Sequence, residues 1–167
     1  DWDVSNGTNF SGMFGHASSF NKDIGDWDVS SGIYFQDMFR DSEFNQDIND
    51  WDVSSGTDFA SMFEESKNFN QDLSGWDVSA ATNFTYMFHE AEAFNQDIGD
   101  WDVSSGTSFS GMFSEAFSFN QDISSWDVSS SAHLDDMFSR ATEMLANQGV
   151  TETPDRSYFV GPATDDG

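Results

Sequence analysis

The sequence has few or none of several residue types, and each shortage excludes a class of protein. Cysteine is absent, so the 167-residue chain has neither disulfides nor thiolate metal ligands. Only five Lys and Arg oppose 31 Asp and Glu, which gives a formal net charge of -26. Such a surface repels nucleic-acid phosphates and anionic lipid headgroups. We therefore expect no nucleic-acid partner and no direct membrane insertion, and instead a basic or cation-bridged partner.

Long apolar runs and proline are also scarce. No stretch approaches a length of about 18 consecutive apolar residues, and the N-terminus lacks the basic and apolar regions of a signal peptide. Both prolines, Pro154 and Pro162, lie in residues 151–167, which we interpret as a tail or linker. The chain opens at Asp1 and Trp2, part-way through a repeat, so we expect it to be part of a longer polypeptide.

The main feature that is present is a repeat of 24 or 25 residues. The tetrapeptide WDVS occurs six times, and its tryptophans are separated by 25, 24, 25, 25 and 25 residues. A fixed period of this size is typical of a solenoid, in which each repeat buries its apolar face against its neighbours. His16, His89 and His133 occupy three different repeat positions, so no catalytic constellation recurs. We expect a protein that is not an enzyme.

One repeat predicts a short strand, a turn, a short helix and a polar turn. Trp101 and Val103 alternate with polar residues, which is the pattern of a half-buried strand. An amphipathic stripe with i, i+3, i+4, i+7 spacing follows: Phe109, Met112, Phe113 and Ala116. The predicted fold is therefore an α/β solenoid, a right-handed coil with short parallel strands on one face and short helices on the other.

The sixth repeat departs from this pattern, which suggests a division of the chain. Its helical stripe is about twice as long as the others and no FNQD follows it, as expected for a capping element that closes the core. We predict a repeat array over residues 1–131, comprising five repeats and the strand of a sixth. A C-terminal capping helix over 132–150 and the tail over 151–167 would follow.

The combination FNQDIxxWDVS, followed by a Met-Phe pair, resembles the BspA-like class of leucine-rich repeats over residues 1 to about 138. This resemblance implies a leucine-rich-repeat solenoid on an extracellular or cell-surface protein, engaged in adhesion and protein recognition, without a catalytic motif. Members of that class usually carry Asn-Val after WDVS. This chain instead has a small residue in the second of these positions: Gly7, Gly32, Gly56, Ala81, Gly106 and Ser131.

Stacked repeats would place acidic and hydroxyl side chains in columns on the strand face, away from the core. We predict that a partner binds three sets of these residues: Asp28, Asp52, Asp77, Asp102 and Asp127 of WDVS; Asp26, Asp50 and Asp100 two residues earlier; and Ser54, Ser79 and Ser104. The first hypothesis is thus a recognition or adhesion module. The alternative is a rigid acidic spacer in a large extracellular protein, with no ligand of its own.

Such columns also raise the question of charge repulsion. Carboxylates about 4.8 Å apart repel by about 1 kcal/mol in bulk water and about 3.5 kcal/mol at an effective dielectric of about 20. Side-chain splaying with salt screening is one relief, and bridging by Ca²⁺ is another. The candidate Ca²⁺ ligands are Asp3, Asp28, Asp52, Asp77, Asp102 and Asp127, together with Asp23, Asp47, Asp72, Asp97 and Asp122.

A column of asparagines precedes the second of these Asp sets. We predict that each Asn hydrogen-bonds the backbone of the neighbouring coil, because tight solenoid turns leave polar groups that need partners. The column consists of Asn21, Asn45, Asn70, Asn95 and Asn120.

Overall fold

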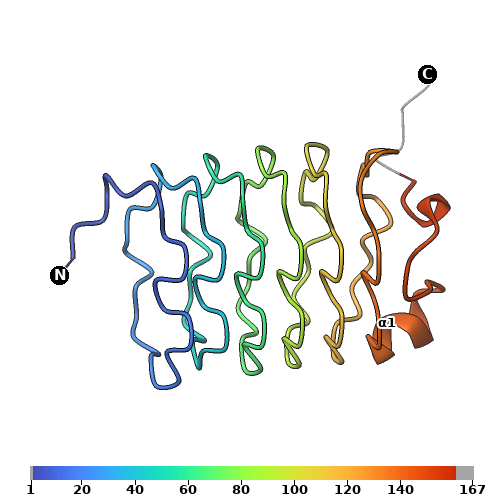
Figure 1. The fold of residues 1–167 in the computed structure, drawn as a ribbon, viewed down its shortest axis with the longest axis horizontal. Helices are drawn as coiled ribbons and strands as arrows, with labels where there is room; N and C mark the ends of the chain where they lie inside the picture. The colour runs from blue at the N-terminus through green and yellow to red at the C-terminus, as the bar shows by residue number, and fades with distance from the viewer. Residues whose placement is uncertain (1, 161–167) are drawn as a thin grey trace.

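The computed structural model describes residues 2–160, which form a stack of six coils (Figure 1). Each coil begins at one WDVS tetrapeptide, and we number the coils 1 to 6 over residues 2–26, 27–50, 51–75, 76–100, 101–125 and 126–150. The C-terminal segment lies against coil 6 at the end of the stack opposite the N-terminus. Asp1 and residues 161–167, the last part of the predicted tail, lie outside the described residues.

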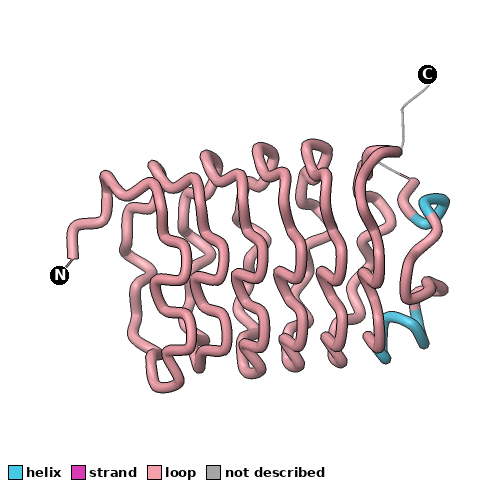
Figure 2. Tube along the Cα trace, viewed as in Figure 1, coloured by secondary structure: helices cyan, strands magenta, loops and turns pink. Residues whose placement is uncertain are grey.

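The coils contain almost no regular secondary structure, so the predicted α/β solenoid is wrong (Figure 2). Within residues 2–160 the helices are α1, Thr142–Asn147, and the 3₁₀ helix η1, Arg156–Tyr158. Strand pairing there is limited to isolated parallel bridges that join Asn9, Tyr34, Asp58, Asn83, Ser108 and His133 in succession. Neither helix has the length or apolar character needed to cross a bilayer.

The stretch predicted to be helical is a series of tight turns, which we call the turn ladder: residues 10–17, 35–42, 59–66, 84–91, 109–116 and 134–141. Two residues of each ladder segment have positive φ, for example Gly111 at 61° and Glu115 at 57°. A left-handed residue at every fourth position is incompatible with an α-helix. The predicted apolar stripe is nevertheless buried, since Phe109, Met112 and Phe113 are fully enclosed.

Backbone hydrogen bonds explain why turns replace the helix. In coil 4 the N–H groups of Phe84, Tyr86 and Phe88 donate to carbonyls of coil 5 at 2.9–3.0 Å. Of the two residues between them, Met87 donates to the Phe84 carbonyl three positions earlier, and Thr85 donates to the Asn83 side chain. Alternate N–H groups therefore bind the next coil, whereas an α-helix would direct all of them to the residue four positions before.

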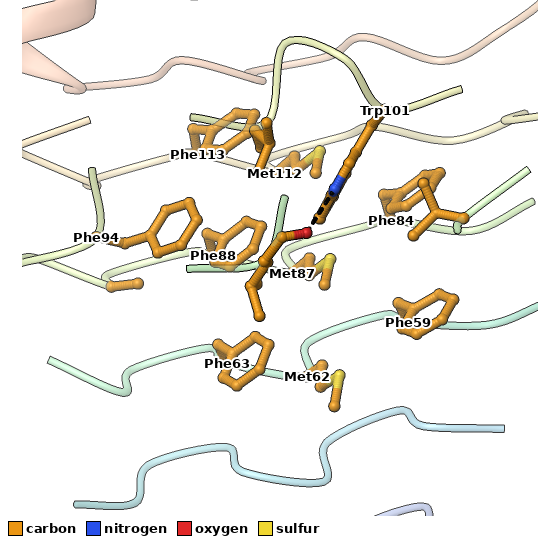
Figure 3. Packing of buried hydrophobic residues seen from close by; sticks show 14 of the residues in the cluster. Phe59, Met62, Phe63, Phe84, Met87, Phe88, Phe94, Trp101, Met112 and Phe113 are labelled. Atoms are coloured by element: carbon orange, nitrogen blue, oxygen red, sulfur yellow. Dashed lines mark hydrogen bonds between the residues drawn. The ribbon is translucent and has the colours of Figure 1, made fainter. Parts of the chain in front are cut away.

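The WDVS segment is not a strand, although its burial alternates as predicted. Trp101 and Val103 are buried, and Asp102 and Ser104 are exposed. Within residues 2–160 no backbone–backbone hydrogen bond joins the WDVS segments of neighbouring coils. The tryptophan side chains connect these turns instead: Trp101 Nε1 donates at 3.0 Å to the carbonyl of Leu73, three residues before Trp76 of the preceding WDVS segment (Figure 3).

The core consists of columns of identical or similar side chains that run along the stack. Phe14, Phe39, Phe63, Phe88, Phe113 and Phe138 form one such column, with ring centroids 5.6–5.8 Å apart. The methionines of coils 2 to 6 form another, fully buried column (Figure 3). These columns pack between the turn ladder and the WDVS segments, so the two stretches expose their outward side chains on different faces.

The asparagine column hydrogen-bonds neighbouring coils, which confirms that prediction. Asn95 Oδ1 accepts the backbone N–H of Asn120 at 2.9 Å and the side-chain amide of Gln121 at 2.9 Å. The same backbone bond joins the earlier members of the column. At the end of the column Gln148 takes over the role of Gln121, since its amide donates to Asn120 Oδ1 at 3.1 Å.

The end of the stack differs from the predicted long capping helix. Residues 134–141 continue the turn ladder, and α1 covers only Thr142–Asn147. The segment after α1 docks on coil 6, where the Glu152 carbonyl accepts the Phe138 N–H at 2.8 Å and Thr153 Oγ1 accepts the Asp136 N–H at 2.8 Å. Glu152 and Thr153 of the predicted tail thus satisfy donors of coil 6 that a further coil would otherwise bind.

Candidate functional site

The most acidic face of the molecule follows the turns on either side of each WDVS tryptophan. We call the Asp residues there the acidic surface: Asp3, Asp23, Asp26, Asp28, Asp47, Asp50, Asp52, Asp72, Asp77, Asp97, Asp100, Asp102, Asp122 and Asp127. All of them are exposed. Lys22 is the only Lys or Arg within these turns, and Arg156 reaches the turn of coil 6 by donating to the Ser129 carbonyl at 2.6 Å.

The Asp of WDVS is held by the Ser of the same tetrapeptide. In coils 1 to 5 the Ser hydroxyl donates to Asp Oδ1 at 2.6–2.7 Å and the Ser N–H donates to the same oxygen at 3.0–3.1 Å. This local turn, an Asx turn reinforced by a hydroxyl, presents the other carboxylate oxygen outward. Ser54 and Ser104 are exposed and Ser79 is half-buried, but all three hydroxyls already have this acceptor.

The Asp of FNQD forms a second row of similar turns. Asp97 Oδ1 accepts the Gly99 N–H at 3.0 Å, and Asp23, Asp47, Asp72 and Asp122 accept the equivalent N–H at 2.8–3.0 Å. Both rows are therefore spaced by the coils and oriented by short local hydrogen bonds.

Asp26, Asp50 and Asp100 differ from both rows. None of the three carboxylates accepts a hydrogen bond from residues 2–160, although all three are exposed. Asp100 lies where two shallow hollows between coils meet, with volumes of about 420 and 250 Å³. The other carboxylates along these hollows are Asp72, Asp97, Asp102 and Asp127.

At Asp28 and Asp102 of the WDVS column, hydrogen bonding from serine outweighs charge repulsion from the neighbouring Asp. The Ser104 hydroxyl, and then its N–H, hold the pKa of Asp102 below the ordinary value, while the neighbouring charge of Asp77 opposes this with a smaller effect. Asp28 behaves in the same way, with Ser30 lowering its pKa and Asp3 opposing. The serines thus relieve the repulsion that the sequence led us to expect, a role that the Asp-x-Ser spacing could have indicated.

The structure does not gather the predicted Ca²⁺ ligands into a coordination sphere. Among residues 2–160 no group of three or more Asp, Glu or His side chains is arranged to hold a metal ion. Asp127 also lacks the hydrogen bond from serine that the other Asp residues of the WDVS column accept. The turn of coil 6 is shifted by one residue, and Ser129 Oγ lies 3.0 Å from Ser131 Oγ instead. Binding of Ca²⁺ between exposed carboxylates stays a prediction.

Basic side chains gather on the other face, along the turn ladder. Arg40 pairs with Glu64 at 2.9 Å, Lys67 with Glu92 at 2.9 Å and Arg140 with Glu115 at 2.7 Å, each from one coil to the next. The acids of the turn ladder are therefore partly neutralised, whereas those of the acidic surface have no comparable partners. This contrast makes the acidic surface the candidate site for a cationic ligand.

A family model described as "Mycoplasma protein of unknown function, DUF285" matches residues 1–65 and 40–153. The chain belongs to this family. No curated protein and no solved structure matches the chain. Because the description of the DUF285 family names no activity, the function of this member has to be argued from its own residues.

Proposed function

We propose that this DUF285 chain is a non-enzymatic recognition module that binds a basic partner through its acidic surface. The partner would be a protein or cell-surface ligand that presents several Lys or Arg residues, or one that is bridged to the carboxylates by cations. The observation that carries the proposal is the set of 14 exposed Asp residues accompanied by one Lys within the same turns.

The geometry of the acidic surface supports multivalent recognition. In coils 1 to 5 the Asp of WDVS and the Asp of FNQD each recur once per coil and are oriented by local hydrogen bonds, so these side chains lose little freedom when a partner binds. Asp26, Asp50 and Asp100 contribute carboxylates that form no hydrogen bond with residues 2–160. A partner with basic residues along an extended segment could contact several coils at once, and each contact would raise the effective concentration of the next.

The resemblance to BspA-like proteins supports an extracellular or cell-surface location and a role in adhesion. The DUF285 match is compatible with both, since it identifies a repeat family. We include Ca²⁺ as a proposed bridge between the acidic surface and an acidic partner, because exposed carboxylates are suitable ligands for this ion.

A rigid acidic spacer is the second candidate function. Continuous Phe and Met columns and the backbone bonds between coils would make the stack stiff along its length. Under this alternative the negative charge would serve solubility alone, and no partner would recognise the acidic surface.

A peptide of ten lysines tests the proposal. The full chain should bind it with an affinity that falls as NaCl is raised, because exposed charge pairs are screened. Simultaneous substitution Asp26→Asn, Asp50→Asn and Asp100→Asn should weaken binding several-fold without unfolding, since these carboxylates form no hydrogen bond within residues 2–160. Isothermal titration calorimetry gives the affinities and circular dichroism verifies the fold.

The matched control removes three charges from the other face by Asp37→Asn, Asp41→Asn and Asp135→Asn. Asp37 and Asp41 have φ of 54° and 47°, a region that Asn adopts readily, so the backbone should be retained. If both triple variants lose the same affinity, net charge alone attracts the peptide and the proposed surface is wrong. If the wild-type chain does not bind the peptide, the spacer function is favoured.

A further inference from the structure

Two columns of the turn ladder contain side chains whose size differs from coil to coil. Coil 4 has the large residues Tyr86 and His89, and coil 5 has the small residues Gly111 and Ser114 at the equivalent positions. The change in size leaves a surface hollow of about 230 Å³. Its lining consists of Glu64, Tyr86, His89, Ser114, Asp136 and Ser139. The hollow lies on the turn ladder and is separate from the acidic surface.

Tyr86 forms an aromatic wall of this hollow. Its backbone φ of 54° is that of the turn ladder, since the equivalent residue of every coil has a positive φ. The ring lies directly on Gly111, because a Cβ at that glycine would be 2.1 Å from Tyr86 Cε1. The side chain is 44% exposed, and its ring centroid is 5.3 Å from that of His89. An aromatic ring is thus held at the edge of a polar hollow.

The polar lining is rich in acceptors and contains a hydroxyl that is open to the hollow. Ser114 as a residue is only 8% exposed, but its Oγ is not among the buried polar atoms and forms no hydrogen bond with residues 2–160. His89 Nδ1 lies 3.0 Å from the Ser114 carbonyl and therefore carries the proton that it donates there. Glu64 is already paired with Arg40, whereas the exposed Asp136 carboxylate has no ion pair within the described part of the chain.

We propose that this hollow binds the cationic end of one lysine or arginine side chain. The ammonium or guanidinium group would pair with Asp136, donate to the Ser114 hydroxyl and contact the face of Tyr86 by a cation–π interaction. Both acidic groups of the lining favour a cation over an anion, and the volume is below the range of about 300 to 1,000 Å³ typical of drug-sized ligand pockets. A single side chain is the occupant that this space and charge fit.

Two small probes test the proposal on the full chain by NMR. Nα-acetyl-lysine amide should shift the amide signals of Gly111, Ser114 and Ser139, whereas the same compound with an acetylated ε-amine, which is neutral, should not. Equal shifts with both probes would overturn the assignment of a cation site. Shifts at the WDVS amides without shifts in the hollow would overturn it as well, while leaving the proposed acidic surface intact.

Substitutions with matched backbone requirements complete the test. Asp136→Asn removes the carboxylate at φ 53°, and Tyr86→Asn removes the ring at φ 54°; both should weaken binding of the lysine probe about fivefold. The control Asp37→Asn, in the same column at φ 54° but outside the hollow, should leave it unchanged. Equal losses in the control and in Asp136→Asn would show that only net charge matters and would overturn the proposal.

Discussion

The residue two positions after WDVS has to be small, because the ring of the phenylalanine three positions later occupies the space that a larger side chain would need. A Cβ at Gly56 would lie 2.5 Å from Phe59 Cζ and 3.0 Å from the Val53 carbonyl. Coil 4 has Ala81 at this position, and there the ring stack is wider: Phe59 and Phe84 are 6.2 Å apart, against 5.3 Å for Phe35 and Phe59. One methyl group is therefore accommodated only when the ring moves.

We expect Gly56→Ala to lower the free energy of unfolding by about 1 to 3 kcal/mol, the usual cost of inserting a methyl group into a filled core. Urea titration followed by tryptophan fluorescence measures the change. The reverse substitution Ala81→Gly is the control and should alter stability by less than about 1 kcal/mol, because it adds only backbone freedom. A Gly56→Ala variant as stable as the wild type would contradict the steric explanation.

Between elements, neighbouring WDVS segments are joined by side chains and not by a ladder of strands. Each indole from coil 3 to coil 6 donates at 3.0–3.1 Å to the carbonyl of the residue three positions before the preceding tryptophan. The acceptors are Ile24, Ile48, Leu73 and Ile98. Each of these buried carbonyls also accepts the backbone N–H of the tryptophan three positions later, so the indole is its second donor. The tryptophan accordingly has two roles. Its ring fills space in the core, and its indole N–H donates a hydrogen bond that aligns one coil with the next.

Trp101→Phe tests the second role. The Leu73 carbonyl would keep the Trp76 N–H as a donor but lose the indole, and one such hydrogen bond contributes about 0.5 to 1.5 kcal/mol. The smaller ring would also leave a cavity. Chemical denaturation should therefore show a loss of at least about 1 kcal/mol. Trp2→Phe is the matched control, because Trp2 is 68% exposed and its indole has no acceptor within residues 2–160; its effect should stay within about 0.5 kcal/mol. Equal losses in the two variants would contradict the bridging role.

For the whole molecule, charge is distributed unevenly over two faces of one stack. Cations pair with acids along the turn ladder, and the acidic surface, with 14 Asp and one Lys, accounts for half of the net charge of -26. Self-repulsion of this size opposes the compact state, although the serines of WDVS stabilise individual carboxylates. Added salt should therefore stabilise the folded chain.

Thermal melts separate general screening from specific ion binding. Raising NaCl from about 10 mM to about 300 mM should raise the midpoint, since the screening length falls below the distance between coils two or three positions apart. If Ca²⁺ bridges the Asp columns, millimolar CaCl₂ should raise the midpoint further than MgCl₂ at the same concentration, and EDTA should reverse the gain. Identical midpoints in CaCl₂ and EDTA would eliminate the Ca²⁺ bridge.

The period of the sequence was sufficient to predict the side-chain columns. Residues spaced by one repeat, such as Phe88 and Phe113, stack as expected, and the asparagines bind the next coil as expected. The alternation of Trp101 and Val103 with polar residues also gave their burial correctly. Burial depends on which residues are apolar and on their position in the repeat, and both can be read directly from the sequence.

The backbone conformation was decided by the tertiary structure. A stripe at i, i+3, i+4 and i+7 is buried equally well by an α-helix or by turns with a left-handed residue every fourth position, so spacing alone cannot distinguish them. Asp37, Ser61 and Tyr86 adopt positive φ without a glycine that would have indicated it. The neighbouring coils favour the turns, because they accept alternate N–H groups that a helix would retain for itself. The hollow beside Tyr86 likewise exists only because coils of different side-chain size are adjacent.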